Sequence, residues 1–336
     1  MKKISLKDIA KLAGVSTSTV SFVLNGKADT MRISKPIADK ITAIAKKSGY
    51  HPNQLAVSLR TGQSKTIGLL VEDISNNFFA ALAKFIEDEA NKYGYKVVYC
   101  STENNNQKAK ALLQMLSHQQ VDGFLITPTD EIDKDIQQLI DYNRPVVLMD
   151  RFLPSVSTPY VLVNNFAGVE TGMLHLIEKG YRNIGFVTVD LNMIQMQKRD
   201  EAYIETIRKH RKLIKKTLLL RLHYNEPTKD SVKKIAGFIK KSSLDAIFFS
   251  TNYLGILGLE SIKQLKLKIP DQLAMICFDD HDIFRLHTPE ITTIRQPIKE
   301  IARSAVQILL AQMENKKQPG KKQVEIMPQM ILRAST

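Results

Sequence analysis

Cysteine, tryptophan and long hydrophobic runs are scarce in this chain of 336 residues, and each scarcity excludes a class of protein. Its two cysteines, Cys100 and Cys277, lie in separate apolar segments, and tryptophan is absent. Two such cysteines form neither a disulfide framework nor a set of metal ligands. No run of eighteen apolar residues occurs, and the first residues lack the apolar segment of a signal peptide. We therefore expect a cytoplasmic protein without a membrane span.

Glycine-rich phosphate loops are also missing. Neither GxGxxG nor GxxxxGK occurs, which disfavours an enzyme of the nucleotide-binding kind. The seven histidines are scattered, and no Ser/His/Asp or Cys/His set that would support nucleophilic catalysis is legible. We expect a protein that is not an enzyme, with no catalytic residues, no metal and no cofactor.

Acidic residues are rare at the start of the chain. Residues 1–65 hold twelve lysines and arginines against three acids, whereas the remaining 271 residues hold 36 against 31. About a fifth of the chain thus carries +9 of the total net charge of +14. Such an excess is the electrostatic footprint of a segment that binds nucleic acid. A solvated lysine-rich surface would give a similar number, so the charge supports a DNA-binding motif without replacing it.

A motif of the required kind stands at residues 4–25, ISLKDIAKLAGVSTSTVSFVLN. Ser5, followed three positions later by Asp8, is a capping-box pattern that begins a short helix. Gly14 supplies a tight turn, and Ser16 caps a second helix with its own apolar face. This is the pattern of a helix-turn-helix, although an ordinary helical hairpin would share it. At or beside the exposed N-terminal end of the second helix lie Thr17, Ser18, Ser21 and Phe22.

A third helix is expected to complete a headpiece of residues 1–50. Ser34 is its predicted N-cap and Gly49 its C′ residue. Between them, apolar side chains recur at helical spacing, at Ile37, Ile41, Ile44 and Ala45. The following residues 51–65 are too short and too polar for a core helix, and we interpret them as a hinge helix and linker.

Taken in order, these segments resemble the DNA-binding end of transcription repressors of the lactose/galactose repressor (LacI/GalR) family. The matching residues are Ile9-Ala10, Ala13-Gly14-Val15-Ser16, Thr19-Val20-Ser21, Val23-Leu24-Asn25, Tyr50, Pro52 and Ser58-Leu59-Arg60. The resemblance implies a sequence-specific regulator, most often a repressor, that binds a pseudo-palindromic operator as a homodimer. It also implies control by a small effector, which either melts or orders the hinge.

The same resemblance implies roles for individual residues. Thr17 and Ser18 would approach base edges, and Phe22 stands where many family members have an Arg or His that bonds a base. Phosphate contacts are expected from Ser5, Ser16 and Asn25. Residues 53–60 would form the hinge helix, with Arg60 at its end. Leu59 would wedge apart a central base step in the minor groove, unless it only packs within the linker.

From Thr66 onward, apolar segments of strand length alternate with amphipathic helical segments. Near-continuous apolar strands separated by helices predict parallel sheets covered on both faces. Two series of such strands predict two doubly wound lobes, and the resemblance implies an α/β core like that of periplasmic binding proteins. The expected strands are 66–71, 96–100, 121–127 and 145–150, and then 183–188, 217–222, 246–251 and 273–279.

The resemblance also implies where the lobes begin and end. The chain would cross between them three times, with strand-like segments at 160–165 and 292–297 and a last long helix at about 298–313. In the core of residues 66–336, the N-lobe would then comprise about 66–163 and 297–322. The C-lobe would comprise about 164–296 and 323–336.

A cleft between the lobes, at the carboxyl ends of the strands, is the expected effector site, and the family usually closes it on sugars. The positions that carry over from the family are aromatic platforms, an arginine clamp and polar partners for hydroxyl groups. In this chain they are Phe78, Phe79, Arg151, Asn164, Arg199, Asn252, Asp279 and Gln296. Buried polar groups discriminate strongly between ligands, because the wrong ligand leaves them unpaired.

Plainer interpretations stay open for several of these residues. Phe78 and Phe79 would alternatively be core residues of a helix, and Arg199 would begin a solvated basic helix. The polar cluster at 279–282 is a poor metal site, since adjacent residues at a strand end rarely converge on one ion. The chain departs from the family pattern at Asn164, the methionine-rich segment 191–197, Ala202 and Tyr253. A cleft that is not used for a sugar is therefore an alternative.

Two other classes of protein compete with the regulator. A periplasmic sugar-binding protein would share the two-lobed core, but it would need a signal peptide and would lack the headpiece. An architectural DNA-bending protein would be basic without a cleft-bearing second module. The first 65 residues argue against the former, and the expected core argues against the latter.

Overall fold

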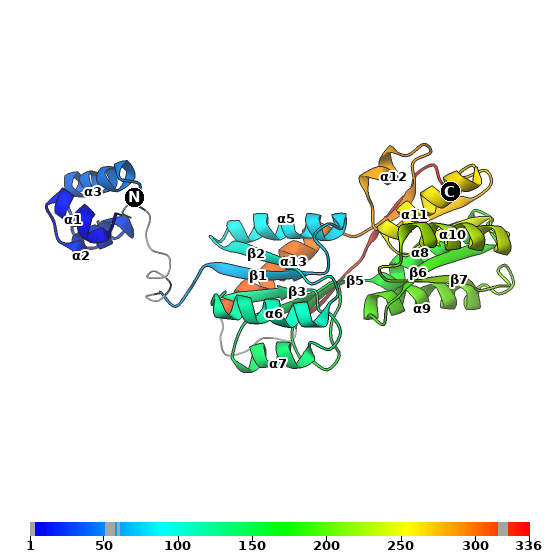
Figure 1. The fold of residues 1–336 in the computed structure, drawn as a ribbon, viewed down its shortest axis with the longest axis horizontal. Coiled ribbons are helices and arrows are strands. Elements are labelled where there is room, and N and C mark those ends of the chain that lie inside the picture. Colours follow the sequence, from blue (N-terminus) through cyan, green and yellow to red (C-terminus); the bar gives the residue numbers. More distant parts are fainter. Residues whose placement is uncertain (1–3, 51–57, 59–60, 315–321) are drawn as a thin grey trace. The chain divides into compact units, whose positions relative to one another are not determined.

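The computed structural model describes residues 4–50, 58, 61–314 and 322–336. The chain divides into two compact units, Met1–Ser64 and Lys65–Thr336. The described part of the first unit is helical, and the second unit contains two sheets flanked by helices (Figure 1). The division falls beside Thr66, where the first strand begins.

Three short helices form the first unit, α1 (Leu6–Ala13), α2 (Thr17–Leu24) and α3 (Lys35–Lys47). The Ser5 hydroxyl accepts a hydrogen bond from the Asp8 N–H, and the Asp8 carboxylate accepts one from the Ser5 N–H. These two bonds complete the predicted capping box. Gly14 ends α1 with φ of 73°, a left-handed conformation that glycine adopts without strain.

The three helices bury a small core of alanine and branched side chains, Ile9, Ala10, Ala13, Val20, Val23, Ile41 and Ala45. Two expectations for α3 are corrected. Ser34 stands at the N-cap position but makes no side-chain cap hydrogen bond. Ile37 is 39% exposed, because the stripe that α3 buries is narrower than predicted and runs through Ile41 and Ala45.

The first lobe of the second unit is a six-stranded sheet in the order β11-β5-β4-β3-β1-β2, with every neighbouring pair parallel. Its strands are β1 (Thr66–Val71), β2 (Lys96–Ser101), β3 (Gly123–Ile126), β4 (Val146–Met149), β5 (Tyr160–Val163) and β11 (Gln323–Ile326). One face is covered by α5 (Asn77–Asn91) and α13 (Ile298–Glu314), the other by α6 (Asn106–His118) and α7 (Asp133–Asp141). Cover on both faces explains the near-continuous apolar strands.

The second lobe is also a six-stranded sheet, in the order β12-β10-β9-β8-β6-β7. Its strands are β6 (Ile184–Asp190), β7 (Leu218–His223), β8 (Ala246–Phe249), β9 (Ala274–Phe278), β10 (Thr292–Arg295) and β12 (Gln329–Ile331). Helices α8 (Asn165–Glu178) and α9 (Ile194–Lys209) cover one face, α10 (Thr228–Ser242) and α11 (Asn252–Leu265) cover the other, and α12 (Asp282–Leu286) precedes β10. The edge strand β12 runs antiparallel to β10, which differs from the purely parallel sheet predicted.

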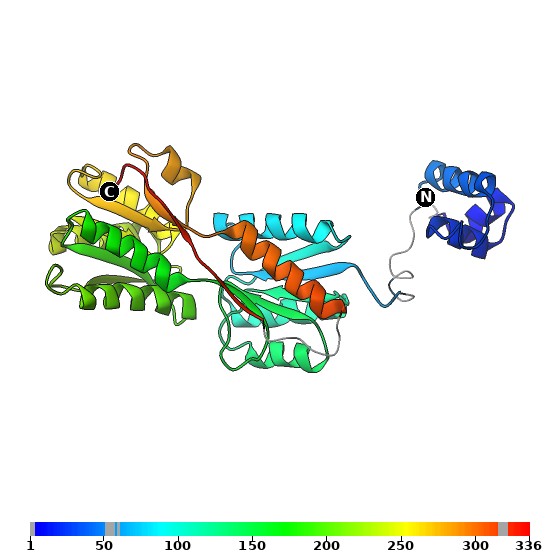
Figure 2. The ribbon, with the colours of Figure 1, turned by 180° about the vertical axis from the view of Figure 1, so that it is seen from behind.

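The chain crosses between the lobes three times, from β5 to α8, from β10 to α13 and from β11 to β12 (Figure 2). The third crossing lies later than expected. Residues 323–326, assigned to the C-lobe from the sequence, form β11 and pair with β5 in the first sheet. The alternating burial of this strand suits a sheet edge of either lobe, so its pattern carried no information about its partner.

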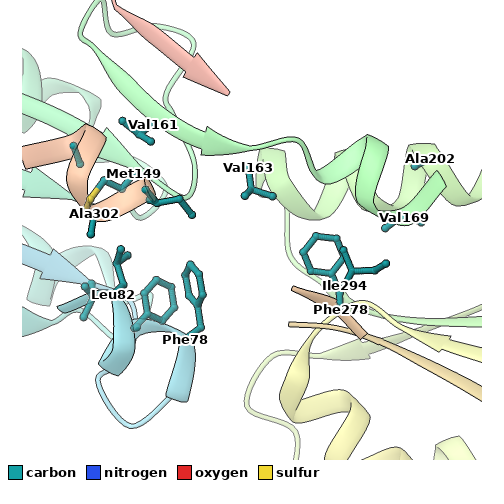
Figure 3. Close-up of a cluster of buried hydrophobic side chains, with 14 of the residues drawn as sticks. Phe78, Leu82, Met149, Val161, Val163, Val169, Ala202, Phe278, Ile294 and Ala302 are labelled. Carbon is teal, nitrogen blue, oxygen red and sulfur yellow. The ribbon is translucent and has the colours of Figure 1, made fainter. Parts of the chain in front are cut away.

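One apolar cluster runs through both lobes. It joins side chains of α5 and β4 in the first lobe to side chains of α8, β9 and β10 in the second (Figure 3). Val163 lies at the end of β5, where the chain passes from one lobe to the other. None of the helices in the described ranges is long and apolar enough to cross a membrane.

Candidate functional site

The N-terminal end of α2 is the exposed polar edge of the first unit. The Ser16 hydroxyl accepts a hydrogen bond from the Thr19 N–H at 3.1 Å, which fixes the start of the helix. Thr17 and Ser18 follow immediately and are exposed, whereas Ser21 and Phe22 are half-buried. Thr17 and Ser18 are therefore the most accessible of the predicted base-reading residues.

The other predicted DNA-binding residues already have local hydrogen bonds. Ser5 and Ser16 are N-caps, and the Asn25 side-chain amide donates to the Ser21 carbonyl at 2.5 Å. Such bonds fix the ends of α1 and α2, and the caps already engage the backbone N–H groups of Ser5, Asp8 and Thr19. Leu59, Arg60 and residues 53–57 of the hinge expected at 53–60 lie outside the described residues.

In the second unit, most of the predicted effector residues converge between the carboxyl ends of the strands of the two lobes. A space of about 40 Å³ lies among Phe78, Phe79, Arg199, Asp279 and Gln296. Two open grooves of about 520 Å³ adjoin it, one on the side of Tyr224 and the other on the side of Arg295. We call this space and its walls the cleft.

Arg199 is the most enclosed charge of the cleft, with 2% of its surface exposed. Its Nε donates to the Asn165 Oδ1 at 2.7 Å, and one terminal nitrogen donates to the Ser250 carbonyl. The same nitrogen lies 3.8 Å from the Asp279 carboxylate, and the guanidinium stacks 3.7 Å above the centre of the Phe278 ring. The alternative of a solvated arginine at a helix start is wrong, since α9 begins at Ile194 and Arg199 is buried.

Asp279 and Gln296 form a second pair at the floor of the cleft. The Gln296 amide donates to the Asp279 carboxylate at 2.6 Å, and both side chains are buried. Asp279 has φ of 69°, a strained conformation for a residue other than glycine. Strain at this position is consistent with a carboxylate held for binding. The neighbouring Asp280 is bonded to Arg295 and Arg333 and so has cationic partners of its own.

Arg151 joins the cleft from the first lobe through acidic neighbours. It lies 2.5 Å from the Glu72 carboxylate and 3.6 Å from that of Asp150, and it also donates to the Met193 sulfur of the second lobe. Glu72 follows β1, and Asp150 follows β4. The cleft region therefore holds three carboxylates, buried in Asp279 and half-buried in Glu72 and Asp150, against the two guanidinium groups of Arg151 and Arg199.

Burial changes the protonation behaviour of these groups. It raises the pKa of Asp150 to about 6, although the Arg151 guanidinium acts in the opposite direction. It also raises the pKa of Asp279 and lowers that of Arg199, while their mutual attraction opposes both shifts. The Asp150 and Asp279 carboxyls are therefore easier to protonate than solvated ones.

Two hydrogen bonds join the lobes directly across the cleft. The Asn252 side chain, at the start of α11, donates to the Asn76 Oδ1 at 3.1 Å. The Tyr224 hydroxyl, after β7, donates to the Glu72 carboxylate at 3.2 Å. Any movement of the two lobes away from each other would have to break these two bonds.

The two predicted aromatic platforms are core residues that also line the cleft. Phe78 and Phe79 lie in the first turn of α5, belong to the apolar core and also line the cleft. Their rings meet edge to face with centroids 4.9 Å apart. They give the cleft an apolar wall opposite its charges.

Two predicted effector residues, Arg151 and Asn164, are not among the residues that line the cleft and its adjoining grooves, and Asn164 has a capping role. The Asn164 side chain accepts a hydrogen bond from the Ala167 N–H at 2.7 Å and caps α8. Its neighbour Asn165 holds Arg199 instead. At the start of a helix one residue caps and the next faces inward, and the sequence does not distinguish the two.

Several residues of the cleft were missed. Glu72 and Asp150 carry the signal of an acidic residue directly after a buried strand, at the edge where ligands bind in parallel sheets. Tyr253, noted only as a departure from a pattern, lines the cleft together with Gln195, Met196 and Thr251. Gln195 and Met196 belong to the methionine-rich segment 191–197, which was likewise noted only as a departure, and their orientation depends on where α9 begins.

A three-helix unit with an exposed second helix, joined to a two-lobed α/β core, defines the class of helix-turn-helix proteins with a periplasmic-binding-protein-like domain. Family models agree with this class. Residues 5–53 match bacterial regulatory proteins of the lacI family. Residues 64–229 match periplasmic binding proteins and sugar binding domain of LacI family, and residues 173–336 match a periplasmic binding protein-like domain.

Relatives match along almost the whole chain. The ribose operon repressor of Halalkalibacterium halodurans is 30% identical over 334 residues, which cover 99% of this chain and 97% of that protein. The HTH-type transcriptional repressor PurR of Haemophilus influenzae is 29% identical over 335 residues, 98% of each chain. A crystal structure of the lac repressor dimer bound to operator and the anti-inducer ONPF shares the fold, with a TM-score of 0.87 at 20% identity, covering 100% of this chain and 99% of that one. The chain belongs to the LacI family.

Proposed function

We propose that this protein is a sequence-specific DNA-binding transcriptional regulator, most simply a repressor, whose operator affinity depends on a small ligand in the cleft. The observation that carries the proposal is the presence in one chain of an exposed α2 terminus and a polar, largely buried cleft. Both features suit binding, and we propose that the protein acts by binding rather than by catalysis. A regulator of this kind works beside the chromosome, and we place it in the cytoplasm.

On DNA, the protein would act as a homodimer on a pseudo-palindrome, because two-fold symmetry of the protein is matched by that of the site. Thr17 and Ser18 would read base edges, with the Thr17 methyl group available to a thymine methyl. Phe22 cannot donate a hydrogen bond, so an apolar contact would replace one. Contacts to phosphates at the starts of α1 and α2 would fix the register.

The effector that suits the cleft is a small polyhydroxylated molecule. Asp279 and Gln296 present an acceptor and an amide to vicinal hydroxyl groups, Arg199 presents donors, and Phe78 presents an apolar face. This combination of aromatic surface and fixed polar groups suits the two faces of a sugar ring. We therefore propose a sugar or sugar derivative.

The charges of the cleft narrow this choice to an uncharged ligand. Three carboxylates face two guanidinium groups, and each guanidinium already has an acidic partner. A phosphate group would meet like charge without a free cation, and such juxtaposition costs several kcal/mol at a desolvated site. A neutral sugar should therefore bind in preference to its phosphate.

Coupling between the two units follows from differential binding. A ligand shifts an equilibrium only if it binds one arrangement of the lobes better than the other. Entry of a sugar that moves the lobes apart would break the pairs Asn76–Asn252 and Glu72–Tyr224, which changes how the lobes contact one another. We propose that this change alters the ordering of residues 53–60.

The test is selection of duplex DNA from a random pool by the purified full-length protein, with and without panels of neutral sugars and sugar phosphates. An enriched palindrome whose recovery changes with one neutral sugar is the expected result. Enrichment that no sugar alters would retain the DNA-binding function and remove the sugar from the cleft. Failure to enrich any sequence under all conditions would contradict the regulator.

A further inference from the structure

The end of the second lobe that faces away from the cleft collects four helix-to-strand connections. Strands β6, β7, β8 and β9 are parallel neighbours, so their N-terminal ends share one edge of the sheet and their carboxyl ends share the cleft edge. We take each connection to run from the last three residues of a helix to the residue before the next strand. The four connections are then 176–183, 207–217, 240–245 and 263–273. We call this surface the basic end.

Charge is distributed very unevenly between this surface and the rest of the core. The four connections hold thirteen lysines and arginines and three acids. The other residues of 66–336 hold the remaining 23 basic and 28 acidic side chains. The core outside the basic end is therefore net acidic, and its overall positive charge comes from this one surface.

The centre of the basic end is the segment RKHRKLIKK at residues 208–216, which has six lysines and arginines and no acid. Ile214 is fully buried and anchors the segment in the core, and the Leu213 and Ile214 N–H groups donate to the His210 carbonyl. The segment is thus held against the lobe, and its cations are exposed in a fixed arrangement. They are Arg208, Lys209, Arg211, Lys212, Lys215 and Lys216.

Few of these cations are neutralised by neighbouring acids. Lys209 pairs with Glu170, and Arg208 lies 3.8 Å from Glu205. In the part of the chain that the structure describes, Arg211, Lys212, Lys215 and Lys216 form no ion pair. Asp245, one of the three acids here, accepts hydrogen bonds from the backbone N–H groups of residues 182 and 183 and so turns toward the protein.

The fold itself does not require this charge, as the first lobe demonstrates. Its three equivalent connections, into β2, β3 and β4, hold two basic residues and three acids in residues 89–95, 116–122 and 139–145. Cations do stabilise helix C-termini, but only within the last turn. Four of the cations follow the end of α9 at Lys209, so the helix dipole does not account for them.

We infer that the basic end is a second nucleic-acid contact, which binds the phosphate backbone of a duplex without reading its sequence. Phosphate contacts need fixed, unpaired cations and no apolar surface. A protein partner would require an apolar centre, whereas Leu213 is the one exposed large hydrophobic side chain of these connections, all of which the structure describes. A regulator held on its operator would present this surface to another segment of DNA at high local concentration.

The test uses full-length protein in three forms on an immobilised operator duplex, selected as above. A labelled duplex of unrelated sequence is added after the operator sites are saturated. The variant K212Q/K215Q/K216Q removes three charges from the basic end. The control K134Q/K229Q/K233Q removes three exposed lysines from α7 and from the first two turns of α10.

The parent and the control should retain the second duplex, and retention should fall about tenfold or more between about 50 and 200 mM salt. The K212Q/K215Q/K216Q variant should lose at least about tenfold of this retention at low salt, with operator capture unchanged. Equal retention by both variants would overturn the inference. So would competition by polyglutamate as strong as that by duplex, which would indicate an acidic polypeptide partner.

The inference depends on the proposed function only for the first capture step, which is measured separately. If no operator is captured, the proposed function fails, and the three forms are compared for direct binding of the unrelated duplex. Loss confined to K212Q/K215Q/K216Q would then still support the basic end. Identical binding by all three forms would reject it.

Discussion

Asp150 shows how one buried acid links the cleft to pH. Its usual pKa of 3.8 rises to about 6, because burial outweighs the attraction of Arg151. Between these values the unfolded chain loses a proton that the folded protein keeps. The free energy of unfolding therefore falls as pH rises from about 4 to about 6. Above pH 6 the ionised Asp150 carboxylate lowers it by the full amount of about 3 kcal/mol.

Asp150→Asn should remove this cost, since the amide carries no charge to desolvate. We expect the free energy of unfolding to increase by about 1–3 kcal/mol at pH 8 and to change little at pH 4. Urea denaturation of both forms across this range measures the difference. A variant that is less stable than the parent at pH 8 would mean that the Asp150–Arg151 pair outweighs desolvation.

Leu59 is a residue whose role rests on the sequence motif. Leu59→Ala should weaken operator binding markedly and leave binding to unrelated duplex nearly unchanged, since a wedge acts only where the duplex bends. Fluorescence anisotropy with both duplexes measures the two affinities. Equal operator affinity for variant and parent would reject the wedge.

At the scale of elements, glycines determine how closely helices approach the second sheet. A Cβ added at Gly258 of α11 would lie 2.1 Å from the Phe249 ring of β8. The fully buried ring has no room to move, so the helix must shift. A Cβ at Gly237 of α10 meets nothing within 4 Å.

Gly258→Ala should therefore destabilise the protein by about 1–3 kcal/mol, whereas Gly237→Ala should stabilise it by up to about 1 kcal/mol through helix propensity. Both substitutions replace glycine by alanine in helices that cover the same face of the second sheet. Each therefore serves as a control for the other. Urea denaturation followed by circular dichroism compares them. A similar effect of the two substitutions would mean that α11 adjusts without cost.

Strands and helices were predictable because their sequence patterns are strong. Buried parallel strands are near-continuous apolar runs, and ten of them were expected close to where they occur. The ends of the strands were predicted less accurately. A strand was expected over 121–127, but β3 comprises only Gly123–Ile126. The sheet to which β11 belongs was predicted wrongly, because the sequence of an edge strand does not indicate which strand it pairs with.

The site was predictable where the family motif fixed a position, and less so elsewhere. Arg199, Asp279 and Gln296 do come together. Asn164 was predicted for the cleft but caps α8, and Asn165 contacts Arg199 instead, since a rotation of one residue at the start of α8 decides which side chain faces Arg199. Glu72 and Asp150 escaped notice because a single acid after a strand is common and becomes informative only when burial is known.

At the scale of the whole molecule, ligand and DNA binding should separate by mutation. Gln296→Met keeps the volume of the side chain but removes the donor to Asp279. Because Gln296 belongs to the second unit and α2 to the first, we expect operator affinity within about twofold of the parent and a ligand affinity about tenfold weaker or more. Operator binding measured against rising sugar concentration tests both, and a parallel loss of operator affinity would contradict the separation of roles.

The three crossings also govern the order in which the protein can be completed during synthesis. The first lobe receives α13 and β11 only from residues 298–326, after every parallel strand of the second lobe has been made. The second lobe in turn waits for β12, at residues 329–331. Neither lobe is a contiguous piece that can close while the ribosome continues, so both must stay partly open until the last few residues emerge. In a regulator built in this way, both sheets become complete late in synthesis and almost together.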